Sequence, residues 1–501
     1  MLDDSPFLSL ASSPPRAEDV TSLDSKTDFA GKSLALEEPT SDRRKFGYAW
    51  YVVVLLAMSN GISFFDRGFV ALVIDPIKHT LHITDTEIGV MIGPAFILFY
   101  STVSLPLGRL ADSYRRKNII ICGMLFWSIC TGTFGVAKNF LVLAASRMGV
   151  GLGEASLVPA GVSMIADIFP RHRISRAVAA FTAGGMLGGS MASFIGGPML
   201  GWLGKVGTVH VPILGALEPW QASFVIISTP GVIVGLIILA TMREPARKHA
   251  PIAETAGATL SETAAFLWKN KFSSASLILG FACVSAQSGV SSWLPTYYMR
   301  TFHLTPAQIG PPMGIIGIIV GVPTAILGGY IADRLRQRGR EDSNIMIGIY
   351  GLAAMIPLLL IQFNLNNPWI AIAVGAPSLF AVAMIYGVAH PNVSLCVPAN
   401  MRSQAVAIYL LSANTLGIGI VPLLIPVITD YVFHDPQSLR YAMSIVTVIF
   451  LPLGLLLLAL ARKPFIAYAQ AANSSTAGGS ADAAAESLGV TGARAIIIPS
   501  E

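Results

Sequence analysis

Long apolar stretches separated by short polar loops dominate this chain from about residue 49 to residue 461. Each stretch has about the 20 residues that an α-helix needs to cross the hydrocarbon core of a bilayer. The pattern predicts an all-α integral membrane protein with twelve spans. They are expected at residues 49–73, 88–107, 118–136, 141–165, 177–200, 222–242, 274–298, 309–331, 345–363, 369–388, 405–428 and 441–461.

Three segments without a sustained apolar pattern divide the chain. Residues 1–45 are rich in Ser, Pro, Asp and Glu, and residues 464–501 in Ala, Ser and Gly, which predicts two disordered cytoplasmic tails. Residues 243–272 are more polar than the flanking spans, and their segment 261–269 is typical of a short amphipathic helix at a membrane surface. The remaining parts are an N-terminal six-helix bundle, 46–242, and a C-terminal one, 273–463, with residues 243–272 as the cytoplasmic linker.

The two bundles share an internal repeat. Residues 108–117, with the sequence GRLADSYRRK, return as residues 329–338, GYIADRLRQR. At the same spacing His82-Ile83-Thr84 falls on His303-Leu304-Thr305, and Glu87-Ile88-Gly89 falls on Gln308-Ile309-Gly310. The register holds without a gap, so we interpret the halves as copies of one duplicated unit, a common construction of transporters.

Lys and Arg are distributed unequally between the two membrane faces that the predicted spans define. Lys and Arg gather in the loops after even-numbered spans, as at residues 115–117, 171–176 and 334–340. By the positive-inside rule that side is cytoplasmic and both termini lie on it, in the cell (inner or plasma) membrane. These loops also account for the net charge of +5, so no nucleic-acid partner is expected.

Ionisable residues inside a span are costly in hydrocarbon and therefore indicate function. Four lie well inside predicted spans, all in the first bundle: Asp66, Arg67, Arg147 and Glu154. The repeat counterpart of Asp66 is Gln287, which keeps polarity without charge. Arg147 and Glu154 are two helical turns apart and so share a helix face. The glycines between them allow another helix or a ligand to approach that face.

Two interpretations of these residues are open. Asp66 and Arg147 can neutralise each other and lock two helices together, or a buried carboxylate beside a cation can be a proton site that a carrier loads and unloads. Glu154 lies nearer the outer part of its span, where we expect water to reach it. Arg67 points to a different face from Asp66 and is expected to orient the first helix or contact an anionic group. Lone polar residues, Gln362 and His390, are weaker candidates.

At this point the chain resembles a known family. Twelve spans in two repeated halves, with Gly-x-Leu-Ala-Asp-x-x-x-Arg-Lys after the second span, are similar to the major facilitator superfamily over about residues 48–463. Four segments resemble its Spinster-type branch: Phe65-Asp66-Arg67, DSYRRK at 112–117, GVGLGEAS at 149–156 and IADIFP at 165–170. Ser113 stands where the common pattern has Arg, which weakens one expected gate contact.

The resemblance implies a rocker-switch carrier, in which two six-helix bundles rock about a central cavity that opens to either side in turn. The cytoplasmic loops are then gates, in which Asp112 lies near Arg116 and Arg173. The gating residues implied are Asp112, Arg116, Asp167, Arg173, Asp333 and Arg336. Such a carrier binds a small-molecule or lipid-like substrate and protons, works in the lipid bilayer, and is expected to be a monomer.

We therefore expect a secondary active transporter that moves a small organic anion or an amphipathic lipid-like solute by alternating access, coupled to protons. Arg67 or Arg147 can hold the carboxylate of an anion, and the apolar, Gly-rich cavity walls suit an amphipathic ligand. We expect the partner of Arg147 to be Asp66 or Glu154 in the empty cavity and the substrate in the occupied one.

Other classes of protein fit the sequence less well. A transporter-like membrane sensor that binds without transport is expected to carry a signalling domain, for which neither tail has the composition. No nucleophile, metal cluster or phosphate loop occurs in a loop long enough to hold an active site, so neither an enzyme nor a cofactor is expected. The four cysteines lie in apolar runs and are interpreted as core residues.

Overall fold

A computed structural model describes residues 40–212, 214–247, 258–337 and 342–477. The chain divides into two units, Met1–Phe46 and Gly47–Glu501, and the second contains all the contacts discussed below. Within the described residues, 12 helical stretches are long and apolar enough to cross a membrane. The predicted all-α membrane architecture is confirmed.

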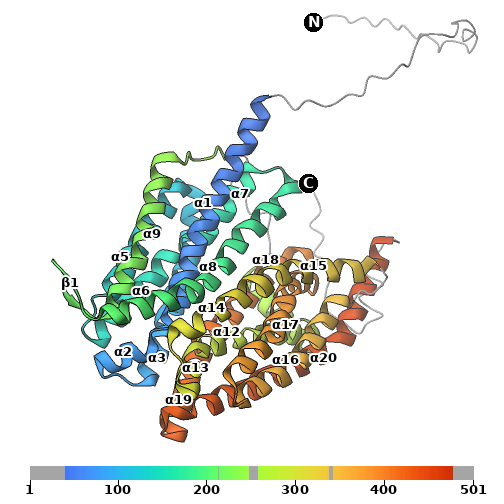
Figure 1. Ribbon diagram of the computed structural model, residues 1–501. Coiled ribbons are helices and arrows are strands. Elements are labelled where there is room, and N and C mark those ends of the chain that lie inside the picture. The colour runs from blue at the N-terminus through green and yellow to red at the C-terminus, as the bar shows by residue number, and fades with distance from the viewer. Residues whose placement is uncertain (1–39, 213, 248–257, 338–341, 478–501) are drawn as a thin grey trace, which may run out of the picture. The chain divides into compact units, whose positions relative to one another are not determined.

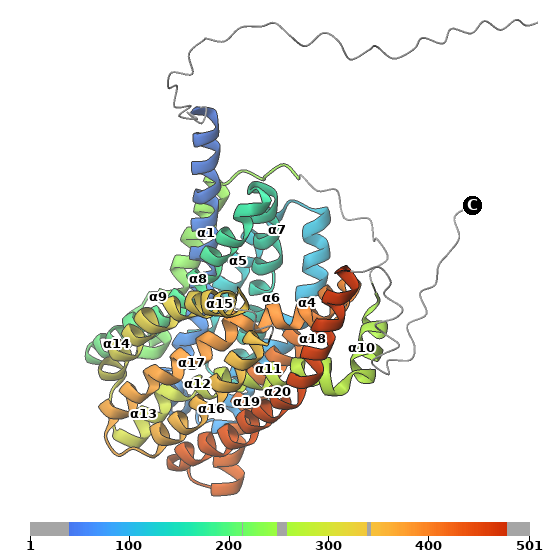
Figure 2. The ribbon, with the colours of Figure 1, turned by 90° about the vertical axis from the view of Figure 1, so that its right-hand side faces the viewer.

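Helices of the first half gather beside one another, and those of the second half lie next to them (Figures 1 and 2). The first half contains α1 (Thr40–Val70), α2 (Ile74–Leu81), α3 (Asp85–Ile92), α4 (Pro94–Ser113), α5 (Arg116–Phe134), α6 (Phe140–Glu154), α7 (Leu157–Ile168), α8 (Arg171–Val206) and α9 (Pro219–Thr241). A short antiparallel hairpin, β1 (Val209–Val211) and β2 (Gly215–Leu217), joins α8 to α9.

The linker and the second half contain α10 (Leu260–Lys269), α11 (Ser276–Val284), α12 (Ala286–Ser291), α13 (Leu294–Phe302), α14 (Pro306–Ile316), α15 (Val322–Gln337), α16 (Ser343–Asn364), α17 (Pro368–Leu395), α18 (Arg402–Asn414), α19 (Val421–Ile428) and α20 (Leu439–Ala477). Short π-helical segments η1 (Lys271–Ala275), η2 (Gly317–Gly321), η4 (Thr415–Ile420) and η5 (Thr429–Phe433) interrupt three of these spans, and 3₁₀ turns η3 (Ala399–Met401) and η6 (Pro436–Ser438) lie between helices. Interruptions of this kind bend a helix or redirect its side chains.

The duplication is visible in the backbone. His82 ends α2 in the left-handed conformation at φ 53°, and His303 ends α13 in the same way at φ 55°. The next helix then starts with a capping box in both halves, formed by Thr84 with Glu87 and by Thr305 with Gln308. The same local chemistry thus sets the start of the second span and of the eighth.

Close helix crossings join the two halves. A Cβ added to Gly310 on α14 would lie 2.9 Å from the Cα of Gly197 on α8, so both positions need glycine for the helices to approach this closely. On the other side of the interface, a Cβ added to Gly89 of α3 would meet Pro426 of α19. The halves are therefore in direct backbone contact.

Both predicted tail boundaries need correction. Helix α20 continues to Ala477 instead of ending at residue 463, because the Ala-rich sequence that follows has high helix propensity and extends a helix that is already nucleated. Helix α1 begins at Thr40, inside the predicted tail of residues 1–45. The rest of both tails, residues 1–39 and 478–501, lies outside the described residues.

Candidate functional site

The four ionisable residues predicted inside spans come from two helices of the first half. Helix α1 carries Asp66 and Arg67 in its last turns, and α6 carries Arg147 and Glu154. Asp66 is 2% exposed, Arg147 4% and Glu154 1%. The groups lie close enough to interact electrostatically. The structure therefore brings all four predicted residues into one buried cluster.

Arg67 and Glu154 form the ion pair of this cluster. The Arg67 Nε donates to Glu154 Oε2 at 2.7 Å, and Nη2 lies 2.5 Å from the same oxygen. The expectation that water reaches Glu154 is wrong, because α6 packs against α5 at this level: a Cβ on Gly153 would meet Gly123 and Trp127. Arg67 thus has a carboxylate partner, although it points away from Asp66.

Arg147 has no such partner. It forms no ion pair with another described residue, and its Nε makes no hydrogen bond. Asp66 and Glu154 act on Arg147 electrostatically, but neither forms a direct ion pair with it. Two turns of helix separate Arg147 from Glu154 by about 10 Å along the axis, and Arg67 already occupies one oxygen of Glu154.

Asp66 is only partly satisfied. Thr131 of α5 donates its hydroxyl to Asp66 Oδ2 at 3.2 Å, whereas Oδ1 has no hydrogen-bond partner among the described residues. The second oxygen of Glu154, Oε1, is likewise unpartnered and buried. Unmet polar atoms at this depth are costly, and a proton or an approaching donor would relieve that cost.

Two aromatic residues of α4, which the sequence analysis missed, lie beside the guanidinium groups: Phe96 contacts both, and Tyr100 contacts Arg67. The Phe96 ring centroid lies 4.6 Å from Arg67 Cζ and 5.1 Å from Arg147 Cζ. Tyr100, one turn further along α4, lies 5.0 Å from Arg67 Cζ. Phe96 and Tyr100 are spaced i, i+4 and so share a face of α4. This spacing could have indicated an aromatic face from the sequence, but not that arginines contact it. Cation–π contacts of this kind stabilise a buried charge.

The polar candidates of the second half differ in their surroundings. Gln287 of α12 is 9% exposed and donates only to Ser291 Oγ, at 3.4 Å, while its Oε1 has no partner among the described residues. Gln362 of α16 is buried and donates a hydrogen bond to the Tyr298 hydroxyl at 2.8 Å. His390 of α17 is exposed and meets the Tyr409 ring edge to face.

Of the predicted gating residues, the structure joins Arg116 and Asp167. Arg116 Nη1 lies 2.5 Å from Asp167 Oδ2, and its Nε lies 3.1 Å from Glu244 Oε1. These contacts connect the start of α5, the end of α7 and the segment after α9, so they brace the first half. Arg173 is half-buried near the start of α8. The side chains of Asp112, Asp333 and Arg336 lie outside the described residues.

A second cluster of charged residues comes from α2, α3 and α13, so it joins the two halves. These helices lie at one end of the molecule's helices (Figure 1). Arg300 of the second half contacts Asp75 Oδ1 at 2.7 Å and both oxygens of Asp85 at 2.8 Å, and Lys78 lies 3.0 Å from Asp85. We call Asp75, Lys78, Asp85 and Arg300 the Arg300 cluster. Burial alone would lower the pKa of Arg300, but its hydrogen bonds and the charges of Asp85 and Asp75 hold that pKa above its ordinary value.

The Arg300 cluster ties the two halves together. Close by, Asp430 of the second half accepts hydrogen bonds from the Thr86 amide at 2.8 Å and the Thr86 hydroxyl at 2.7 Å. The sequence analysis did not find this cluster, since each residue alone is an ordinary loop charge. Comparison of the two repeats gives only a weak signal for the cluster. The residues at equivalent positions differ, since His79 corresponds to Arg300 and Pro306 corresponds to Asp85.

Comparison with known proteins adds three findings. A family model of the Major Facilitator Superfamily matches residues 56–422. An MFS-type efflux pump of Mycolicibacterium smegmatis is 28% identical over 62% of this chain and 68% of its own length. A probable L-galactonate transporter of Escherichia coli is 24% identical over 78% of this chain and 85% of its own length.

Among solved structures, the chain is similar to a bacterial homologue of the human lysosomal transporter Spinster in an inward-facing and occupied conformation. The TM-score is 0.70 at 24% identity, and the match covers 84% of this chain and 98% of the other. This likeness supports the arrangement of the helices described above.

Proposed function

The chain belongs to the major facilitator superfamily, and from that membership we propose that it carries a small organic anion across the membrane in step with protons. A member of this superfamily is a multi-pass membrane transporter and not an enzyme. The proposal concerns what is carried, what drives it and which residues take part.

The observation that carries the proposal is the unpaired Arg147. A guanidinium in a span costs at least about 2.5 to 3.5 kcal/mol on insertion scales, and here Arg147 has a contact with the Phe96 ring but no ion pair with a described side chain. A guanidinium is planar and binds a carboxylate through two parallel hydrogen bonds. An organic acid would supply the partner that the protein does not.

The buried carboxylates are the proposed proton-binding groups. Asp66 Oδ1 and Glu154 Oε1 are buried without a hydrogen-bond partner among the described residues. Protonation of Asp66 would remove its negative charge from the neighbourhood of Arg147 and favour the binding of an anion there. Release of the anion would favour loss of the proton in turn, so the two binding events are linked through one shared charge.

Alternating access requires a gate at each end. The Arg300 cluster and the Thr86–Asp430 contacts hold the halves together at one end, which we assign to the outer face. We propose that they separate when that face opens. At the opposite face, Asp112, Asp333 and Arg336 are the proposed gate residues, and the Arg116–Asp167 pair braces the first half there.

The relatives support an anionic substrate but leave room for a second candidate. One related protein is named as a probable L-galactonate transporter, which is a carrier of a sugar acid. A lipid-like amphipathic solute is the second candidate, and the observation that favours it is the set of aromatic rings around Arg67, from Phe64 of α1 and from Phe96 and Tyr100 of α4. Both substrates would place an anionic group at Arg147.

Uptake into proteoliposomes under an imposed pH gradient tests the proposal. The panel contains sugar acids, aromatic acids and a lysolipid, each with and without the gradient. We expect an organic acid to accumulate only when the gradient is present. Accumulation of the lysolipid alone would favour the second candidate, and binding without accumulation of any compound would contradict transport and favour a sensor.

A further inference from the structure

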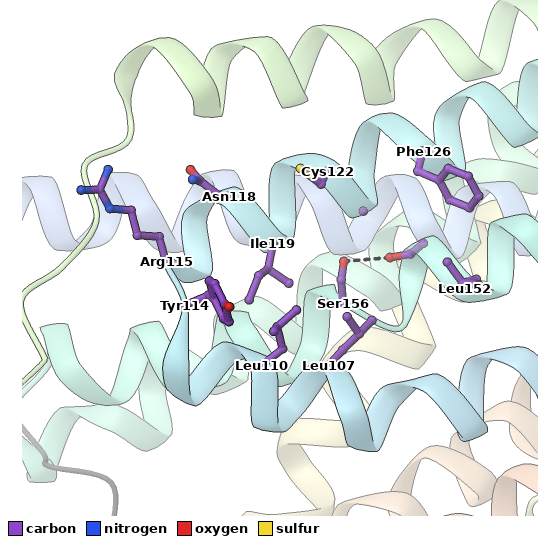
Figure 3. A pocket seen from close by; sticks show the side chains of 12 residues that line it. Leu107, Leu110, Tyr114, Arg115, Asn118, Ile119, Cys122, Phe126, Leu152 and Ser156 are labelled. Carbon is purple, nitrogen blue, oxygen red and sulfur yellow. Dashed lines mark hydrogen bonds between the residues drawn. The ribbon is translucent and has the colours of Figure 1, made fainter.

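A cavity of about 800 Å³ lies on the first half (Figure 3). It opens between α4 and α5, and the region around the end of α6 closes it at the back. Its walls are mostly apolar: Leu107, Leu110, Ile119, Cys122, Phe126 and Leu152. Several of these side chains are exposed, including Phe126 at 43% and Leu110 at 39%. The cavity is therefore accessible from outside the bundle.

The length of the cavity matches one leaflet of a bilayer. Along α5 it runs from Arg115, just before the helix, to Phe126. At about 1.5 Å per residue this distance is about 16 Å, close to half of the hydrocarbon thickness of about 30 Å. An acyl chain from one leaflet would lie alongside the cavity over its full length.

The two ends of the cavity differ in polarity. Arg115 lies at one end with Tyr114 and Asn118 nearby, and the other end is apolar (Figure 3). The Arg115 side chain is exposed and makes no hydrogen bond or ion pair with another described residue. Its neighbour Arg116, in contrast, is 2% exposed and paired with Asp167 and Glu244. A cation without a partner is thus present where the headgroup of a lipid would lie.

We propose that this cavity binds one acyl chain of an anionic phospholipid, whose net negative headgroup interacts with the Arg115 cation. The positive-inside rule assigns this end to the cytoplasmic face, where the leaflet carries anionic lipids. The back of the cavity is the break between α6 and α7, where Ser156 donates its hydroxyl to the Gly153 carbonyl at 2.7 Å (Figure 3). Glu154 lies inside that break, so a bound chain packs directly behind the Arg67–Glu154 pair.

Photo-crosslinking in nanodiscs tests this site on the full chain. The probes are phosphatidylglycerol and phosphatidylcholine with a diazirine on one acyl chain, used in equal amounts, and crosslinked peptides are mapped by mass spectrometry. We expect phosphatidylglycerol to crosslink preferentially to residues 107–126. Arg115→Gln should lower this yield about fivefold, the equivalent of about 1 kcal/mol for one cation at an anionic surface, and should leave phosphatidylcholine unchanged.

Two further variants make the result specific. Arg176→Gln removes an exposed charge on α8 that does not line the cavity and should keep the parent yield. Ile119→Trp fills the cavity and should lower crosslinking at this place for both lipids. Excess glycerol phosphate should not compete, since the apolar walls bind the chain.

Equal yields for the two lipids, or no effect of Arg115→Gln, would overturn the proposal. Competition by a transported acid would also overturn it, because the cavity would then be part of the transport route.

Discussion

At the residue scale, two guanidinium groups with the same neighbour, Phe96, have different partners: Arg67 is half-buried and Arg147 is buried. Arg67 is paired with Glu154, whereas Arg147 is left to the aromatic ring. A buried charge whose partner is removed costs far more than the pair contributes. We therefore expect loss of Arg67 to affect folding first and loss of Arg147 to affect substrate binding first.

Changing Arg67→Gln should destabilise the protein by about 3 to 5 kcal/mol, because it leaves the Glu154 carboxylate buried without its cation. The midpoint of thermal unfolding in detergent measures this loss. The double variant Arg67→Gln, Glu154→Gln should recover much of it. Equal midpoints for the parent and the single variant would show that the pair does not support the fold.

Changing Arg147→Lys keeps the charge but removes the planar fork that binds a carboxylate through two hydrogen bonds. We expect substrate affinity to fall at least about tenfold, which is about 1.4 kcal/mol, with the unfolding midpoint near that of the parent. Equilibrium binding of the acid found in the uptake panel measures the affinity. Parent affinity in this variant would mean that Arg147 only braces the helices.

Changing Asp66→Asn should abolish accumulation driven by a pH gradient, because the amide no longer takes up and releases a proton. Exchange of labelled for unlabelled substrate should persist in part, since Arg147 is intact. Glu262→Gln, at an exposed position of α10, is the matched control, because Gln also serves in a capping box. If Asp66→Asn still accumulates substrate against its gradient, another residue carries the proton.

At the element scale, helix ends and helix breaks place the charges. Helix α6 ends at Glu154 and α7 begins at Leu157, so the buried carboxylate lies at the interruption of the fourth span. Helix α13 continues beyond the seventh span and presents Arg300 to Asp75 of α2 and Asp85 of α3. One element of the second half is thereby held by two elements of the first.

Changing Arg300→Gln should release this contact and open the outer face more often. Thr296→Cys supplies the reporter, since Thr296 is fully buried and donates to the Ala71 carbonyl of the first half. Its labelling by a membrane-impermeant thiol reagent should rise at least about tenfold if the lost pair contributed about 1.4 kcal/mol to closure. Lys78→Gln is the control. Lys78 contacts Asp85 within the same half, so its loss should have a smaller effect on the labelling. Unchanged labelling in Arg300→Gln would remove the Arg300 cluster from the gate.

At the scale of the whole molecule, the two halves are copies that have diverged in charge. The capping boxes after His82 and His303 are alike, yet the four ionisable residues inside spans all belong to the first half. Gln287 occupies the repeat position of Asp66 in the second. We infer that one half binds substrate and protons while the other provides the surface against which it moves.

Orientation is the prediction that belongs to this scale. Epitope tags at both termini should be protected from external protease in intact cells and cut only after the membrane is permeabilised, because the basic loops stay inside. A tag introduced in the β1–β2 hairpin should be cut in intact cells, since that loop lies on the opposite face. Cleavage of either terminal tag in intact cells would contradict the predicted topology.

Sequence alone was sufficient for the span count, the repeat and the four residues that meet in the buried cluster. These depend on local properties: the hydropathy of about 20 successive residues, the cost of a charge in hydrocarbon and the register of two copies. It was also enough to set Arg147 and Glu154 on one helix face. The tail boundaries were less certain, because helix extension past a span depends on propensity as well as hydropathy.

Only the tertiary structure decided which groups meet. Glu154 pairs with Arg67 and not with Arg147, the Phe96 ring contacts both guanidinium groups, and Arg300 reaches across to Asp75 and Asp85. Each contact joins residues far apart in the chain and depends on the rotation of a helix about its axis and on the place where it breaks. Hydropathy is insensitive to both, because a span satisfies the membrane equally well at any rotation.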